Sequence, residues 1–204
     1  MKILIARDEA FNFLYRANVD TRRNVGDVEF FSPLRDSHLP KCDLLYLPGG
    51  YPELFSSGLS NNRSMRNDIK EYAELGGMTY AECGGFMFLC NSIDDKPMCG
   101  VLPIYATMDN ARLHLGYRQM IVGTPDNEYV IKGHEFHYSD IVTDDSALAR
   151  RGIRCERNQL SAKGMPTATA IFRYKNVIAG YTHWYWAENG FPFFNLKNTS
   201  KENI

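Results

Sequence analysis

The sequence of 204 residues lacks a long hydrophobic run, an excess of either charge and any Cys-x-x-Cys pair. The apolar run nearest the N-terminus, residues 3–6, is far too short for a signal-peptide core or a membrane span. Lys and Arg number 23 and Asp and Glu number 24, so no general attraction to nucleic acid or to an anionic membrane is expected. These absences predict a cytoplasmic protein with neither kind of partner.

The cysteine pattern excludes two further classes of protein. Five cysteines, an odd number without metal-ligand spacing, argue against a disulfide framework or a zinc knuckle. His134 and His137, three apart on an expected strand, make a poor metal pair, so no metal site is predicted. The chain also has no Gly-Lys dipeptide and hence no P-loop, so ATP chemistry is not assigned to its residues.

Alternating strand and helix patterns in the first half predict an α/β fold. Expected strands cover 2–6, 28–31, 43–47 and 78–82, and expected helices cover 10–25 and 62–75. Such alternation is typical of a three-layer, mostly parallel sheet covered by helices.

The C-terminal half predicts a β-rich insertion within the same domain. Strands are expected at 119–122, 129–137 and 167–174, with a hairpin over 168–178 that turns at Lys175-Asn176. Residues 177–181 would return to the core sheet. We expect one domain over 1–194 and a polar tail over 195–204.

Cys83 stands where a predicted strand runs into Gly84-Gly85 and an apolar helix, which is the layout of a nucleophile elbow. A helix N-terminus aimed at the sulfur would favour the thiolate, and the N–H of Gly84 would stabilise an oxyanion. The alternative, a buried structural cysteine, is the interpretation for the other four.

The loop after the strand 43–47 offers a second oxyanion donor, because ligands bind beyond the carboxyl ends of parallel strands. Backbone N–H groups of Gly49 and Gly50 could face a tetrahedral oxygen, and Tyr51 and Glu53 could wall a substrate pocket. A plain turn is the alternative.

Among five histidines, His183 follows a predicted strand at its carboxyl end, where a catalytic base belongs. His137 remains a close alternative, whereas His38 is expected in solvent and His114 has no evident role. Strand alternation places Glu135 and His137 on one face and His134 on the other.

Two further groups have open roles. Arg7, Asp8 and Asn12 follow the first strand and would either contact a partner or substrate or cap a helix. The aromatic run 184–186 is expected in packing or in an interface.

Five motifs in order resemble the glutamine amidotransferase domain of the cobyrinic acid a,c-diamide synthase family. They are residues 6–13 (ARDEAFNF), 31–36 (FSPLRD), 49–53 (GGYPE), 80–85 (YAECGG) and 133–139 (GHEFHYS). The resemblance covers about residues 3–190 and implies the class I, flavodoxin-like glutaminase fold.

The resemblance implies Cys83 as nucleophile, His183 as its partner, and Gly50 and Gly84 in the oxyanion hole. The Glu that usually follows two residues after the histidine is replaced by Tyr185. Glu135 and Glu188 are therefore the candidates for the third member of the triad.

The same resemblance implies hydrolysis of glutamine through a thioester, with ammonia passed to an ATP-dependent synthetase that amidates the a and c carboxylates of cobyrinic acid. ATP and Mg²⁺ would bind that synthetase, which is either the rest of a longer chain or a separate polypeptide. Cobyric acid or nickel-sirohydrochlorin are alternative acceptors. A non-catalytic module with this fold and a different thiol enzyme are alternative functions.

Overall fold

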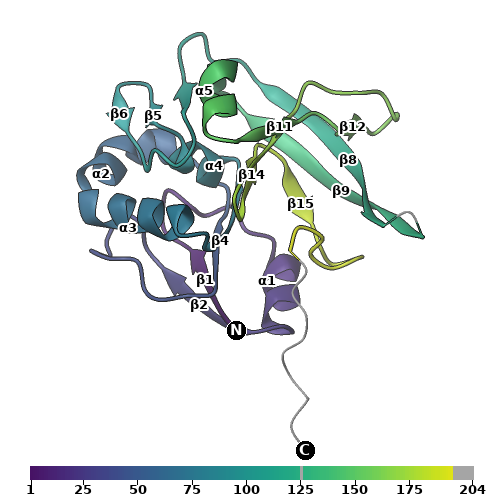
Figure 1. Cartoon of the computed structure of the whole chain (residues 1–204), viewed down its shortest axis with the longest axis horizontal. Coiled ribbons are helices and arrows are strands. Elements are labelled where there is room, and N and C mark those ends of the chain that lie inside the picture. Colours follow the sequence, from purple (N-terminus) through teal and green to yellow (C-terminus); the bar gives the residue numbers. More distant parts are fainter. Residues whose placement is uncertain (125, 195–204) are drawn as a thin grey trace, which may run out of the picture.

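A seven-stranded sheet forms the centre of the computed structural model, which describes residues 1–124 and 126–194 (Figure 1). The strand order is β11-β13-β14-β4-β3-β1-β2. The parallel strands are β1 (Lys2–Ala6), β2 (Asp27–Phe31), β3 (Leu44–Leu47), β4 (Met78–Glu82) and β14 (Val177–Gly180). At one edge β13 (Ile171–Tyr174) pairs antiparallel with β14, and β11 (Arg154–Glu156) pairs antiparallel with β13. The predicted α/β class is confirmed; the predicted tail at 195–204 lies outside the described residues.

The central strands bury both faces, which is why their sequences read as continuous apolar runs. Leu4 and Ala6 pack in one core cluster with α2 (Ser56–Asn61), α3 (Arg63–Glu74) and α4 (Gly84–Leu89). Ile3 and Ile5 point the other way, into a cluster that includes α1 (Arg16–Arg23) and the aromatic side chains Trp184 and Trp186. Helices therefore lie on both faces of the sheet, α1 on one and α2–α4 on the other.

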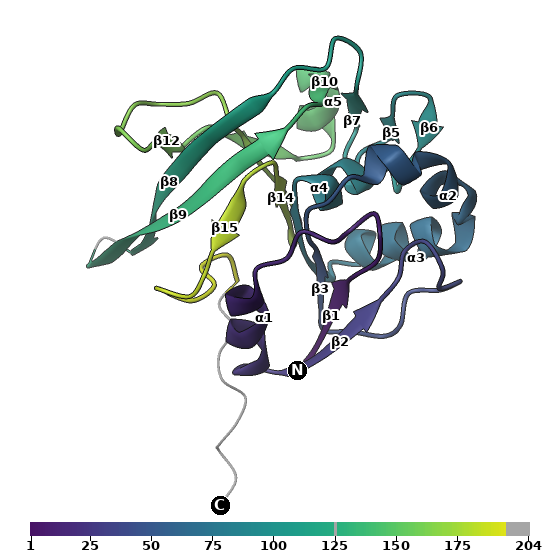
Figure 2. The same ribbon diagram turned by 180° about the vertical axis from the view of Figure 1, so that it is seen from behind.

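The predicted β-rich insertion is present. Its strands, together with two short strands just before it, form two mostly antiparallel sheets beside the main one. The larger contains β12 (Leu160–Ser161), β8 (His114–Thr124), β9 (Asn127–His137) and β15 (His183–Tyr185), in that order. In Figure 2 the long β8–β9 ribbon extends across the molecule and β15 lies against it. The smaller sheet has the strand order β10 (Asp140–Thr143), β7 (Ile104–Thr107), β5 (Ser92–Ile93) and β6 (Lys96–Pro97).

The hairpin predicted over 168–178 is present as β13 and β14, with Lys175 at a positive φ of 50° in the turn. The short helix α5 (Asp145–Arg150) and the 3-10 turn η1 (Pro52–Phe55) were not predicted. Trp184 and Trp186 pack in the core as expected, while Tyr185 is partly exposed. None of the helices in the described ranges is long and apolar enough to cross a membrane.

The predicted helix over 10–25 is wrong in its first part, since α1 begins at Arg16. Residues 10–15 instead run as an extended loop, and the Phe13 N–H donates to the carbonyl of Gly49 at 3.1 Å. Phe11 is completely buried there and contacts Phe88, with 5.4 Å between ring centroids. Tertiary burial of the loop overrides the helical pattern.

Asp8 holds this loop to its neighbour. Its carboxylate accepts from the backbone N–H of Ala10 and Phe11 and from the Ser32 hydroxyl and Leu34 N–H, at 2.8–3.2 Å. Asp8 therefore ties the ends of β1 and β2 together and does not start a helix. Both earlier interpretations of this residue are replaced by a structural one.

Replacing Asp8 with Ala should lower the free energy of unfolding by about 2–4 kcal/mol, because buried donors lose a charged acceptor. Urea unfolding followed by circular dichroism measures the change. Asp20→Ala is the matched control, since Asp20 makes exposed ion pairs with Arg16 and Arg23, and its loss should stay within about 0.5 kcal/mol. Equal effects of the two substitutions would contradict this role of Asp8.

Candidate functional site

Cys83 occupies the turn between β4 and α4 with backbone angles φ 46° and ψ −106°. A non-glycine residue rarely adopts positive φ, and such strain is typical of residues placed for function. The side chain is 4% exposed, and its thiol donates to the carbonyl of Phe136 at 3.6 Å. The predicted nucleophile elbow is therefore present in geometry.

A cavity of about 280 Å³ opens at the carboxyl edge of the parallel strands, above the Cys83 thiol. It is close in size to the smallest small-molecule sites, about 300 Å³, which suits a single amino acid. The loop after β1, the loop after β3, the β4–α4 turn, β9 and β15 all contribute to its walls. The lining residues are Phe13, Gly50, Tyr51, Cys83, His134, Phe136 and His183.

At this edge of the sheet, neighbouring segments come so close to Gly49 and Gly84 that neither position has room for a side chain. A Cβ on Gly49 would lie 2.1 Å from Cε1 of His183, and a Cβ on Gly84 would lie 2.8 Å from Cδ of Pro52. The same Gly84 position is 3.1 Å from the backbone N of Gly50, so the two amides are neighbours. Within the described ranges neither amide donates to a backbone carbonyl, which leaves both N–H groups for an oxyanion.

His183 is buried in the wall of the cavity. Its ring lies edge-on to Phe13, with 4.5 Å between centroids, and stacks on His134 at 4.9 Å. Nδ1 has no hydrogen-bond partner in the described part of the chain and lies 4.0 Å from Oε2 of Glu82. The structure thus brings together Cys83 and His183, as predicted, and adds a carboxyl group behind the imidazole.

Burial sets the protonation of both groups. It raises the pKa of Cys83 to about 12, with a contribution from nearby Glu53, although the Gly84 N–H acts in the opposite direction. It lowers the pKa of His183 to about 3, with smaller contributions from His134 and His137. The resting pair is a neutral thiol and a neutral imidazole. Burial thus opposes the thiolate, whereas the Gly84 N–H at the start of α4 favours it, which is the direction predicted for the helix N-terminus.

Glu82 was not considered in the sequence analysis as part of the site. It is 2% exposed and accepts from the hydroxyls of Tyr46 and Tyr80 and from the Trp184 N–H, at 2.7–3.0 Å. Burial raises its pKa to about 7 against these hydrogen bonds. The position of Glu82 directly before Cys83 in the sequence did not indicate this role. His183 comes close to Glu82 only because β15 folds back against the end of β4.

The two carboxylates predicted as third member of the triad contact other residues. Glu135 accepts from His137 at 2.9 Å and also from Arg118 and Thr169. Glu188 is exposed and pairs with Lys132 at 3.6 Å. Neither has a contact with His183, because Glu135 points to the opposite face of β9 and Glu188 lies beyond the end of β15. The structure therefore does not place Glu135 or Glu188 beside His183; among the described residues Glu82 is the carboxyl group in contact with it, at 4.0 Å.

The predicted substrate-binding residues have different positions. Tyr51 lines the cavity, and Gly49 supports His183 from behind. Glu53 lines a small neighbouring cavity against Cys83, and burial raises the pKa of its carboxyl group. His38 pairs with Asp68 in an exposed loop, as expected of a solvent-facing residue.

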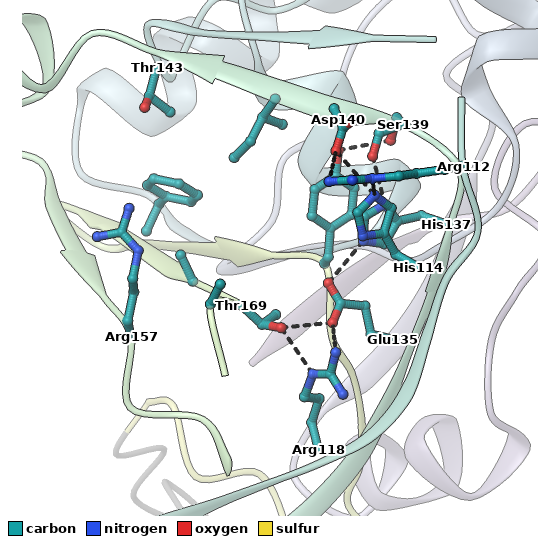
Figure 3. Close-up of a pocket in the computed structure, with 15 residues that line it drawn as sticks. Arg112, His114, Arg118, Glu135, His137, Ser139, Asp140, Thr143, Arg157 and Thr169 are labelled. Carbon is teal, nitrogen blue, oxygen red and sulfur yellow. Dashed lines mark hydrogen bonds and ion pairs between the residues drawn. The ribbon is translucent and has the colours of Figure 1, made fainter. Parts of the chain in front are cut away.

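Strand alternation in β9 is confirmed and divides its side chains between two cavities. His134 and Phe136 face the Cys83 cavity, whereas Glu135 and His137 face a second one of about 400 Å³ (Figure 3). Phe13, His134 and Phe136 are cavity walls that the sequence analysis missed, although the alternation itself already placed His134 opposite Glu135. His137, the alternative base, stacks on Tyr181 at 3.5 Å and does not line the Cys83 cavity.

No group of three or more His, Cys, Asp or Glu side chains in the described ranges has an arrangement that could hold a metal ion.

Comparison with known proteins identifies the same kind of domain. Residues 2–191 match the CobB/CobQ-like glutamine amidotransferase domain. The cobyrinate a,c-diamide synthases of Fusobacterium nucleatum and Methanocaldococcus jannaschii are 39% and 40% identical over 89% and 95% of this chain. The hydrogenobyrinate a,c-diamide synthase of Pseudomonas aeruginosa is 36% identical over 93% of it. The chain spans 40–42% of the length of these three relatives.

Solved structures agree on the fold. PurLQS from Thermotoga maritima superposes with a TM-score of 0.58 at 17% identity, covering 89% of this chain and 86% of that one. Another glutamine amidotransferase structure gives a TM-score of 0.55 at 15% identity, covering 89% of each chain. With the family match over nearly the whole length, these findings show that the chain belongs to the CobB/CobQ-like glutamine amidotransferase domain family.

Proposed function

We propose that this domain hydrolyses glutamine at Cys83 and releases ammonia for the amidation of a carboxylate. One observation supports this most directly: Cys83, His183 and Gly50 line one cavity of about 280 Å³, and Gly84, the residue after Cys83, lies next to Gly50. A thiol, a neutral base and two free N–H donors are the groups that acyl transfer from an amide requires.

The reaction begins from the neutral pair. Sγ of Cys83 attacks the side-chain carbonyl carbon of glutamine while His183 takes the thiol proton, and the Gly50 and Gly84 amides stabilise the oxyanion. His183 then gives the proton to the departing nitrogen, so the C–N bond breaks and ammonia leaves a glutamyl thioester. Water attacks the thioester with His183 again as base, which releases glutamate and restores the thiol.

Glu82 serves in this proposal as the residue that positions His183. Its Oε2 is 4.0 Å from Nδ1, and the Tyr46 and Tyr80 hydroxyls hold the carboxyl group in place. A carboxyl group with a pKa near 7 is already ionised in part of the molecules at neutral pH, and its carboxylate form would stabilise the imidazolium that forms when His183 takes the thiol proton.

We infer the acceptor of the ammonia from the names of the relatives. Their names describe a,c-diamide synthesis on cobyrinate or hydrogenobyrinate, and the domain here matches about two fifths of each. We infer that ammonia passes to an ATP- and Mg²⁺-dependent synthetase that amidates the a and c carboxylates of cobyrinic acid. That synthetase corresponds to the part of the relatives that the present chain does not cover.

Incubation with 6-diazo-5-oxo-norleucine, a reactive glutamine mimic, should add one label to the chain, measured as intact mass. Cys83→Ala should abolish the label, and Cys90→Ala, at a cysteine that is buried away from the cavity, should retain it. A label on the Cys83→Ala variant, or none on the folded wild type with synthetase present, would contradict the proposal.

Gly49→Ala should slow labelling of Cys83 at least about 100-fold, because the new methyl group displaces His183 and small misplacements at a reacting centre have effects of that size. Gly58→Ala is the matched control. It lies in α2, and its nearest contact is a flexible Leu34 methyl at 3.2 Å, so labelling should be unchanged. Wild-type rates in Gly49→Ala would show that His183 is not required.

Alkylation of Cys83 by iodoacetamide should accelerate about tenfold per pH unit from pH 7 to 10, because the thiolate reacts and a pKa of about 12 keeps its fraction proportional to hydroxide. Peptide mass spectrometry separates Cys83 from the partly exposed Cys42 and Cys155. A rate that is already constant at pH 7 would instead indicate a resting thiolate–imidazolium pair.

A further inference from the structure

The second cavity, of about 400 Å³, lies behind β9 on the side away from the Cys83 cavity and has no part in the proposed hydrolysis. His137 and Ser139 line both this cavity and the small one against Cys83. The second cavity is therefore separated from the nucleophile by a single layer of side chains. The residues that line the second cavity indicate a negatively charged ligand.

One wall is a fully satisfied ionic network (Figure 3). Glu135 accepts from Arg118, from His137 at 2.9 Å and from the Thr169 hydroxyl at 2.7 Å. Burial alone would raise the pKa of Glu135, but these hydrogen bonds and the charge of Arg118 lower it to about 2. Glu135 is thus ionised and has its charge neutralised by protein groups, so it does not call for a cation.

A second carboxylate in this wall, Asp140, also has basic side chains as neighbours. Asp140 lies 3.1 Å from Nε2 of His114 and 3.8 Å from the guanidinium of Arg112. The His114 ring stacks on His137 at 4.6 Å, which joins the two groups into one wall. The Asp140 carboxylate therefore has two basic neighbours, although it is more exposed than Glu135.

Arg157 stands across the cavity from this wall, as Figure 3 shows, and has no carboxylate within 4 Å among the described residues. Three guanidiniums and two carboxylates line the cavity, which leaves one positive charge in excess before either histidine is counted. Phe172 and Ile141 add apolar surface to the lining of the cavity, and Thr143 adds a hydroxyl. One negative charge on a partly apolar ligand restores the balance.

We propose that this cavity binds a carboxylate-bearing small molecule, with Arg157 as its principal contact. The planar guanidinium matches a carboxylate through two parallel N–H donors, and the adjacent apolar surface accommodates a hydrocarbon skeleton. Two sources of such a group are the glutamate released at Cys83 and a separate polycarboxylate. Binding here does not require that Cys83 hydrolyse glutamine.

Isothermal titration of the chain with tricarballylate, with L-glutamate and with inorganic phosphate tests the assignment. At least one carboxylate probe should bind, and Arg157→Ala should weaken that binding about tenfold or more, as expected for loss of a charged hydrogen-bonded pair. Arg154→Ala is the matched control, because Arg154 is an exposed neighbour on β11 that pairs with Glu156 and does not line the cavity. Its affinity should equal that of the wild type.

The outcomes separate the sources. Arg157-dependent binding of glutamate supports the reaction product as ligand, and Arg157-dependent binding of tricarballylate without glutamate supports a polycarboxylate. Glutamate binding that Arg157→Ala leaves unchanged belongs to the Cys83 cavity and, if no other probe binds, overturns the proposal. Binding of phosphate alone, or equal loss in Arg154→Ala, overturns it as well.

Discussion

Close packing of main chain around the β4–α4 turn is the constraint on which the rest of the site depends. The loop after β3 lies so near this turn that the amides of Gly50 and Gly84 become neighbours, and it lies so near β15 that His183 rests on Gly49. Three segments that are distant in sequence are thereby fixed in position. The loop after β3 packs against the backbone of the β4–α4 turn and against the His183 ring of β15. Their alignment is set by excluded volume and needs no flexible side chain to maintain it.

Loss of water from this edge determines its chemistry. Cys83, His183 and Glu82 are each almost completely buried, and desolvation shifts the pKa of all three towards the neutral form. A resting site without full charges avoids the cost of buried ions. The oxyanion and the imidazolium then form together when a substrate amide is present, so that the two opposite charges stabilise each other.

The sequence was informative where local rules control the structure. Apolar runs located β1, β3 and β4, and the strand–Cys–Gly-Gly pattern located the elbow at Cys83, because these features depend on near neighbours in the chain. Glu82 and Phe13 were missed because their roles arise from contacts over long sequence separations. The pairing of β15 with β9 carries His183 to Glu82, and the hydrogen bond from the Phe13 N–H to the Gly49 carbonyl holds residue 13 outside the helix that was expected there.

Strand β9 separates two cavities by nothing more than the alternation of its side chains. A slip of β9 by one residue against β15 would turn Glu135 and His137 towards the thiol and place His134 and Phe136 behind it. The nucleophile would then face an ionic network in place of an aromatic wall. At the far end of the β8–β9 ribbon, beside the Thr124–Asn127 pair, the strands line neither cavity, so a change of length there would leave both walls in place.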